Sequence, residues 1–182
     1  MSHVLVPLAQ GCEELEAITI TDLLVRAGVN VTTCGLDDQP VKASRGITIL
    51  PDTSIDKVQN MSFDLIVLPG GLPGADHLRD NAQIQSLIKK QVSEDKYIAA
   101  ICAAPKALAQ AGVLDGKTAT AYPGVLTALK NSSINISENA VEIDGKIVTS
   151  RGPGTAMDFA LNLIELLEGK EKRNEINRQL VR

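Results

Sequence analysis

The chain has 182 residues, 44% of them hydrophobic, and its 18 lysines and arginines against 22 aspartates and glutamates give a net charge of −4. This length and composition fill one sizeable core, so we expect a single domain over residues 1–182. The acidic balance argues against a dedicated nucleic-acid surface, and two phenylalanines, two tyrosines and no tryptophan argue against a base-stacking platform.

The sequence shows no targeting or membrane signal. The first residues lack a basic leader followed by an apolar stretch, and no later segment reaches the ~18 apolar residues of a membrane helix. Cys12, Cys34 and Cys102 are widely spaced and predict free thiols in a reducing compartment. We therefore expect a cytoplasmic protein with no membrane partner. Two histidines are too few for an evident zinc site, so no metal is expected.

Apolar runs of strand length alternate with segments of helical spacing along the chain. The first part predicts a strand at 4–8, a helix at 13–27, a strand at 29–34 and two short strands within 41–50. The middle predicts a strand at 63–68, a helix at 81–94, a strand at 97–101 and a helix at 105–114. The last part predicts two strands within 141–148 and helices at 155–167 and 170–180. This order indicates an α/β fold: a mostly parallel sheet with helices on both faces and a small antiparallel excursion.

Cys102 lies where the predicted strand 97–101 meets the next helix, between alanines. Small neighbours allow a sharp strand–turn–helix elbow. The elbow would place the sulfur at the positive end of a helix, which stabilises thiolate over thiol. The alternative is that Cys102 is a small core residue, the commoner role of a free cysteine.

Ligands of open α/β sheets collect beyond the carboxyl ends of the strands. Glu16 lies one turn into the first predicted helix and is a candidate to face that point. Partial burial would raise its pKa and let it move protons, whereas a surface charge is the alternative interpretation. Glu13 and Glu14 are expected in the solvated first turn, where acidic residues favour the helix dipole.

The turn at Gly70 and Gly71, together with Ala103, offers backbone N–H groups for a developing oxyanion. An ordinary tight turn explains the two glycines equally well. No histidine stands beside Cys102 in the sequence. His3 begins a strand at the opposite end of the sheet, and His77 is expected in a solvent-exposed loop, so no Cys-His pair is visible.

Four motifs in order are recognisable: residues 13–16 (EELE), 68–71 (LPGG), 100–105 (AICAAP) and 149–155 (TSRGPGT). Together they resemble the ThiJ/PfpI superfamily, and within it the branch of the parkinsonism-associated deglycase DJ-one and its bacterial YajL/ThiJ relatives. The resemblance covers nearly the whole chain. It implies a flavodoxin-like homodimer with a reactive, oxidation-sensitive cysteine.

The resemblance also implies roles for individual residues. Cys102 takes the place of the reactive cysteine and Glu16 that of the protonated glutamate beside it. Gly71 and Ala103 take the places of the backbone oxyanion donors. The residues that the resemblance implies for the pocket lining are Gly70, Tyr122, Gly152 and Pro153. Those that it implies near the dimer interface are Arg26 and Arg45.

Two departures from the pattern bear on mechanism. Peptidase-like members have histidine directly after the cysteine, where this chain has Ala103, and some closer relatives have histidine where it has Tyr122. A tyrosine with pKa near ~10 is a poor base at neutral pH and a competent hydrogen-bond donor. The acid–base work is therefore expected to fall on Glu16.

These features predict a cofactor-independent glyoxalase III or protein deglycase that acts on methylglyoxal-type α-oxoaldehydes or their early protein adducts and protects against oxidative and carbonyl stress. Cys102 would add to the aldehyde and Glu16 would move the proton between adjacent carbons, chemistry that needs no metal or organic cofactor. One alternative is a redox-sensing, chaperone-like stress protein whose cysteine is oxidised to sulfinic acid. A peptidase or amidase, the third, would require His77 to reach the thiol.

Overall fold

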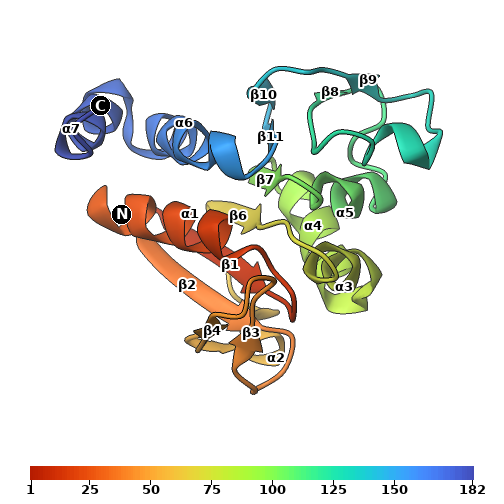
Figure 1. The fold of residues 1–182 in the computed structure, drawn as a ribbon, viewed down its shortest axis with the longest axis horizontal. Coiled ribbons are helices and arrows are strands. Elements are labelled where there is room, and N and C mark those ends of the chain that lie inside the picture. Colours follow the sequence, from red (N-terminus) through yellow and green to blue (C-terminus); the bar gives the residue numbers. More distant parts are fainter.

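The computed structural model describes residues 1–182 and is built around a seven-stranded sheet (Figure 1). The strand order is β10-β11-β7-β6-β1-β2-β5, and every neighbouring pair is parallel except β10 with β11. The strands are β1 (His3–Leu8), β2 (Asn30–Gly35), β5 (Thr53–Ser54), β6 (Leu65–Leu68), β7 (Tyr97–Ile101), β10 (Val141–Asp144) and β11 (Ile147–Ser150). The order confirms the predicted flavodoxin-like sheet with one antiparallel edge strand.

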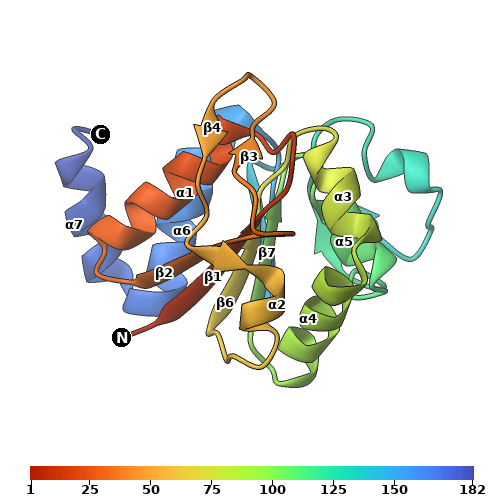
Figure 2. The same cartoon turned by 90° about the horizontal axis from the view of Figure 1, so that it is seen from below.

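Helices cover both faces of this sheet. Figure 2 shows α1, α6 and α7 on one side of the strands and α3, α4 and α5 on the other. The helices are α1 (Glu14–Arg26), α2 (Ile55–Val58), α3 (Gly74–Asp80), α4 (Ala82–Ser93), α5 (Pro105–Gln110), α6 (Ala156–Glu168) and α7 (Lys170–Gln179). The predicted layering, with a parallel sheet between two helical layers, is confirmed.

Two small sheets lie outside the main one. One is the antiparallel pair β3 (Val41–Lys42) and β4 (Thr48–Ile49), and the other the parallel pair β8 (Thr118–Ala119) and β9 (Asn135–Ile136). The β3–β4 hairpin, predicted from the sequence, is fastened to the loop before α1. The N–H of Gly11 donates to the carbonyl of Lys42, and the N–H of Ser44 to that of Cys12, both at 2.8 Å.

Two predicted element boundaries and one predicted loop were wrong. The helix predicted at 105–114 ends at Gln110, because the chain turns through Gly112 with a φ of +75°. The strand predicted at 63–68 begins at Leu65. The segment around His77, predicted as a loop, forms α3, whose Ala75 and Leu78 are buried three residues apart on one helix face.

A single cluster of 50 buried apolar residues forms the core between the layers. On α1 the row Ala17, Ile20 and Leu24 is buried. The adjacent apolar row is not: Leu15, Ile18 and Val25 are 51%, 50% and 59% exposed. The helix therefore presents a second apolar face to solvent. None of the helices combines the length and the apolar character that crossing a membrane requires.

Candidate active site

The turns with unusual composition follow four adjacent strands of the sheet. Helix α1 follows β1, the Gly70–Gly71 turn follows β6, Cys102 follows β7, and the Gly152–Pro153 turn follows β11. Because these strands are parallel neighbours, the turns meet at one edge of the sheet. They frame a pocket of about 360 Å³, lined by Glu13, Ser44, Arg45, Gly71, Leu72, Cys102, Ala103, Tyr122, Val125 and Pro153.

Cys102 forms the sharp elbow that its alanine neighbours predict. Its φ is +62°, in the left-handed region that non-glycine residues avoid at a cost of about 1–3 kcal/mol. Two backbone hydrogen bonds hold this conformation: the N–H of Cys102 donates to the Ser150 carbonyl at 3.0 Å, and the N–H of Tyr122 donates to the Cys102 carbonyl at 2.8 Å. The elbow leaves Cys102 8% exposed and its side chain on the pocket wall.

Gly70 lies between Cys102 and Glu16, where no larger residue fits. A Cβ at this position would lie 2.6 Å from the Cys102 Cβ and 2.8 Å from Glu16 Oε2. The bare backbone lets the Gly70 N–H donate to Glu16 Oε2 at 2.8 Å. Gly71 has a φ of +88°, and a Cβ there would lie 2.4 Å from the Glu13 nitrogen. The sequence Gly-Gly thus permits a close approach of three turns, which a simple tight turn would not require.

The carboxyl of Glu16 is fully buried beneath this turn. Burial raises its pKa to about 7, although the Gly70 N–H and a hydrogen bond with the Cys102 side chain act in the lowering direction. One oxygen, Oε1, is buried without an accepted hydrogen bond. A buried carboxylate oxygen that lacks a donor favours the protonated form. Glu16 therefore holds a titratable proton next to the thiol near neutral pH.

Burial raises the pKa of the Cys102 thiol to about 12, and the charge of Glu16 and its hydrogen bond to the thiol act in the same direction. The N–H groups of Gly71 and Ala103 donate to the sulfur and lower the pKa. The sequence-based expectation of a thiolate favoured by a helix end was wrong, because burial and a neighbouring carboxylate outweigh the backbone donors. Between about 7 and about 12 the pair carries one proton and one negative charge.

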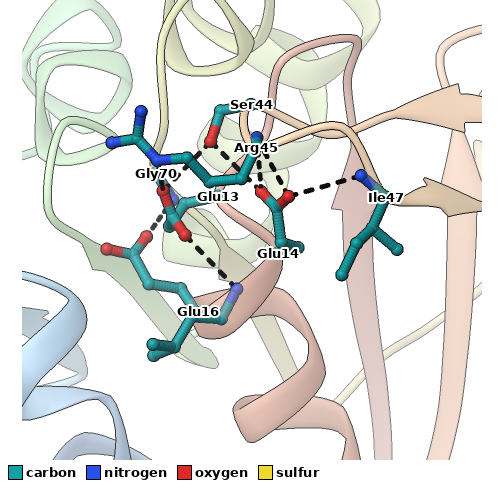
Figure 3. Close-up of polar contacts among 8 residues, drawn as sticks. Glu13, Glu14, Glu16, Ser44, Arg45, Ile47 and Gly70 are labelled. Carbon is teal, nitrogen blue, oxygen red and sulfur yellow. Dashed lines mark hydrogen bonds and ion pairs between the residues drawn. The ribbon is translucent and has the colours of Figure 1, made fainter.

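Glu13 and Glu14 are buried, so their predicted place in a solvated first turn was wrong. They are 8% and 6% exposed because the β3–β4 hairpin folds over them. Figure 3 shows both carboxyls directed toward the hairpin, whereas Glu16 is directed toward Gly70. Glu13 and Glu14 therefore contact the hairpin, whereas Glu16 contacts the Gly70 turn.

Glu14 fastens the hairpin. Its oxygens accept the Arg45 N–H at 2.9 and 3.0 Å and the Ile47 N–H at 3.5 Å, and the Ser44 hydroxyl lies 3.2 Å away. Burial raises the pKa of this carboxyl, but its own backbone N–H, those of Arg45 and Ile47, and the Ser44 hydroxyl lower it by more. The net shift is downward, so Glu14 stays ionised.

The other residues implied by the resemblance fall at different distances from the pocket. Tyr122 and Pro153 line the pocket. Gly152 packs against the Tyr122 ring: a Cβ at this glycine would lie 3.4 Å from the ring carbon Cδ2. Arg45 lines the pocket with a side chain that is 79% exposed. Arg26 lies at the other end of α1 and pairs with Asp22 at 2.7 Å.

Sequence reasoning missed five lining residues. Glu13 was assigned to the surface and Arg45 only to an interface, and Ser44, Leu72 and Val125 were not singled out. The signal for Leu72 was its place directly after Gly71. Ser44 and Arg45 reach the site through the hairpin, a contact that local sequence does not encode.

Neither histidine lines the pocket that holds Cys102. His3, at the amino end of β1, is 2.9 Å from the Thr32 hydroxyl through its Nε2 and packs on Phe63. His77 lines a separate pocket of about 200 Å³ near the ends of β1 and β2. The structure thus provides no Cys-His pair of the kind that the peptidase alternative requires.

Comparison with known proteins agrees with this geometry. A model of the DJ-1/PfpI family matches residues 2–166. The chain is 46% identical over 178 residues to protein dj-1beta of Drosophila melanogaster, with 97% of this chain and 95% of the relative covered. It is 37% identical over 171 residues to the glutathione-independent glyoxalase DJR-1.2 of Caenorhabditis elegans, with 94% and 91% covered. The crystal structure of Drosophila DJ-1beta superposes with a TM-score of 0.96 at 46% identity, over 100% of this chain and 98% of that one.

Proposed function

The chain belongs to the DJ-1/PfpI family, and from that premise we propose that it is a cysteine-dependent glyoxalase or deglycase acting on methylglyoxal-type α-oxoaldehydes or their early protein adducts. A relative that is 37% identical is named a glutathione-independent glyoxalase, which supports this general type of activity. One observation carries the proposal: Cys102 lines the pocket, and the buried carboxyl of Glu16 lies beside it, both next to Gly70.

The first step is addition of the Cys102 sulfur to the aldehyde carbon. A C–S bond forms, the π pair of the carbonyl moves to its oxygen, and Glu16 takes the thiol proton. The N–H groups of Gly71 and Ala103, which donate to the sulfur in the free protein, are beside the developing oxyanion. Transfer of the proton to that oxygen completes a hemithioacetal.

The second step is an internal oxidation and reduction of the substrate. A proton moves from the former aldehyde carbon to the adjacent ketone carbon, and a second proton leaves the first hydroxyl while the ketone oxygen gains one, which turns the hemithioacetal into a thioester of a 2-hydroxy acid. Tyr122 lines the pocket as a phenolic hydrogen-bond donor for a substrate oxygen. Water then hydrolyses the thioester and frees the Cys102 thiol, so the reaction requires no external oxidant or organic cofactor.

Production of lactate from methylglyoxal tests the proposal. We expect the wild-type protein to turn over and the Cys102→Ser variant to lose turnover, because serine lacks the thiolate nucleophile. Cys34→Ser is the matched control, since Cys34 is a buried thiol of β2 outside the pocket. Lactate formation by the wild type no faster than by Cys102→Ser would contradict the proposal.

The same samples separate catalysis from redox sensing. A redox-sensing, chaperone-like protein would gain the mass of two oxygens on Cys102 at low peroxide and form no lactate above the Cys102→Ser background. Steady lactate production by the reduced protein favours the enzyme. Because the assay begins with the thiol reduced, oxidation during purification does not mimic a catalytic defect.

We also propose that the protein acts as a homodimer. The exposed apolar row of α1, formed by Leu15, Ile18 and Val25, supports this proposal, since such a row on one helix face is typical of a protein interface. Arg26 and Arg45 are proposed to lie near the same interface. Sedimentation should give a dimer that Ile18→Glu converts to monomer, and a monomeric wild type at micromolar concentration would refute the dimer.

A cytoplasmic location and a single domain complete the proposal. Three free cysteines are consistent with a reducing compartment. One continuous core of 50 buried residues supports a single domain over residues 1–182. We expect the protein to unfold in one cooperative transition. The fluorescence of an attached label and circular dichroism should report the same transition.

A further inference from the structure

The carboxyl of Glu16 is badly placed for the second step of the reaction. It is fully buried beneath Gly70 and is not among the residues that line the pocket. It lies next to the thiol, but an adduct on the sulfur would extend into the pocket that Cys102 lines, and its carbon-bound proton would be there. A base for that proton has to be sought among the ten residues of the pocket wall.

Glu13 is the one carboxylate among those ten residues. The remaining polar side chains of the wall are the hydroxyls of Ser44 and Tyr122 and the cationic Arg45. None of these accepts a proton from carbon well, because a neutral hydroxyl is a weak base and a guanidinium has no lone pair to offer. The composition of the wall therefore singles out one side chain that can accept a proton from carbon.

The position of Glu13 is fixed by three groups. Its Oε2 accepts the Ser44 hydroxyl at 3.0 Å and lies 3.9 Å from Arg45 Nε, and its Oε1 accepts the Leu15 N–H at 3.4 Å. Figure 3 shows this carboxyl held between the hairpin and the start of α1. The side chain is only 11% exposed. A carboxylate held in this way keeps free lone pairs while its rotamer is restricted.

Helix capping explains this arrangement poorly. Good N-cap residues have short side chains, such as Ser, Thr, Asp and Asn, whose oxygen reaches the N2 or N3 nitrogen directly. The contact from the Leu15 N–H to Glu13 is long at 3.4 Å, and the other oxygen makes its shorter contact with a residue 31 positions away. Helix capping alone therefore does not account for this side chain, which also contacts Ser44 and Arg45 of the hairpin and lines the pocket.

Resting on the proposed function, we propose that Glu13 is the base that removes the proton from the former aldehyde carbon of the Cys102 adduct and returns it to the adjacent carbon. On removal, the C–H pair becomes the double bond of an enediol, and the ketone π pair moves to its oxygen, which takes a proton from water. Return of the proton to the second carbon, with loss of the first hydroxyl proton to water, gives the thioester. The first carbon is oxidised by the two electrons that reduce the second.

This assignment divides the acid–base work between two glutamates. Glu16, buried beneath Gly70, accepts the thiol proton of Cys102. Glu13, on the pocket wall, accepts and returns the carbon-bound proton of the adduct. It also restricts the substrate class: the substrate must carry a hydrogen on the carbon that the sulfur attacks and a carbonyl on the neighbouring carbon. An α-diketone, which lacks that hydrogen, is expected to form an adduct and not to turn over.

The test uses methylglyoxal, with Glu13→Gln as the main variant and Ser44→Ala as the positioning variant. We expect Glu13→Gln to lower kcat by about 10²–10⁴-fold, while the rate of Cys102 alkylation and the formation of the adduct, seen by mass spectrometry, stay within about twofold. Glu13→Asp, which keeps the carboxyl on a shorter side chain, should retain more activity than Glu13→Gln. Ser44→Ala should fall between wild type and Glu13→Gln.

Deuterium on the aldehyde carbon gives a second readout that loss of folding cannot produce. The wild type should show a primary isotope effect on kcat and some deuterium on carbon 2 of the lactate. A kcat for Glu13→Gln within threefold of wild type overturns the assignment, as does a matching loss in the alkylation rate. These outcomes differ from a failure of the proposed function itself. In that case the wild type would form lactate no faster than Cys102→Ser.

Discussion

Two buried carboxyls in the first turn of α1 have pKa values shifted in opposite directions. One faces the β3–β4 hairpin, here called the hairpin side, and the other faces the Gly70 turn after β6, here called the strand side. Glu14, on the hairpin side, accepts the N–H groups of Arg45 and Ile47, and its pKa is lowered. Glu16, on the strand side, accepts the single N–H of Gly70, and its pKa is raised to about 7. Both side chains are buried, Glu16 more deeply. Burial is the largest influence on both pKa values: four hydrogen bonds together outweigh it at Glu14, and two do not outweigh the deeper burial of Glu16.

Glu14 and Glu16 therefore have different roles. The hairpin side uses a permanent charge to fasten the β3–β4 hairpin over the pocket, and the strand side keeps a proton that can move to and from Cys102. Each prediction below tests one half of this contrast.

Removing the titratable carboxyl should have the largest effect. Glu16→Gln keeps the shape of the side chain and cannot take the thiol proton, so we expect turnover of methylglyoxal to fall by about 10²–10⁴-fold. Glu14→Gln should lower turnover by less than about tenfold, since Glu14 touches the hairpin and not the thiol. Steady-state kinetics of the two variants side by side would contradict the contrast if their losses were equal.

Stability should depend on pH through the strand side. The folded pKa of Glu16 is about 7 against an ordinary value of 4.5, so the folded state binds more protons than the unfolded state between these values. Stability is therefore lost as pH rises from 4.5 to 7, by about 3 kcal/mol. Glu16→Gln lacks this loss. Urea unfolding at pH 5 and pH 8 should show the wild type losing stability relative to the variant; parallel behaviour would mean an ordinary carboxyl pKa.

Gly70→Ala should disturb the strand side without changing any titratable group. Its new Cβ would lie 2.6 Å from the Cys102 Cβ, so the elbow and the Glu16 carboxyl must separate. A displacement of this kind costs about a hundredfold in turnover. Gly154→Ala is the control, since a Cβ there meets nothing within 4 Å. Unchanged kinetics in Gly70→Ala would show that the close approach is not needed.

The smallest effect is expected on the hairpin side. Glu14→Ala leaves the N–H groups of Arg45 and Ile47 without their acceptor, which should lower the free energy of unfolding by about 1–2 kcal/mol. Glu138→Ala, at an exposed glutamate, should change it by less than about 0.5 kcal/mol. Chemical denaturation of both variants at pH 7 checks the difference.

Much of the fold could be predicted from the sequence, because strand-length apolar runs and helical spacing are local signals. The strand at Tyr97–Ile101 and the hairpin over 41–50 were placed in this way. Helix α3 was missed because a seven-residue helix with two buried apolar positions, Ala75 and Leu78, gives almost no periodic signal. The end of α5 was misplaced because Gly112 stops the helix earlier than its apolar pattern does.

The candidate site was only partly predictable. Alanines around Cys102 indicated the elbow, and the position of Glu16 in its helix indicated a carboxyl near the strand ends. Two tertiary facts were out of reach. The hairpin that covers Glu13 and Glu14 comes from residues about 30 positions away, and the raised pKa of Cys102 depends on its burial and on Glu16. A helix-end argument considers only local charge and gave the opposite direction.

The pH dependence of Cys102 alkylation tests the central claim most directly, because it observes the proton that Glu16 and Cys102 share. The account predicts a wild-type midpoint well above the free-thiol value, because burial and Glu16 raise the pKa of the Cys102 thiol, and a downward shift of the midpoint in Glu16→Gln, which removes one of these causes. A midpoint near the free-thiol value of ~8.5 in both proteins would show that the two residues titrate independently and would contradict the account.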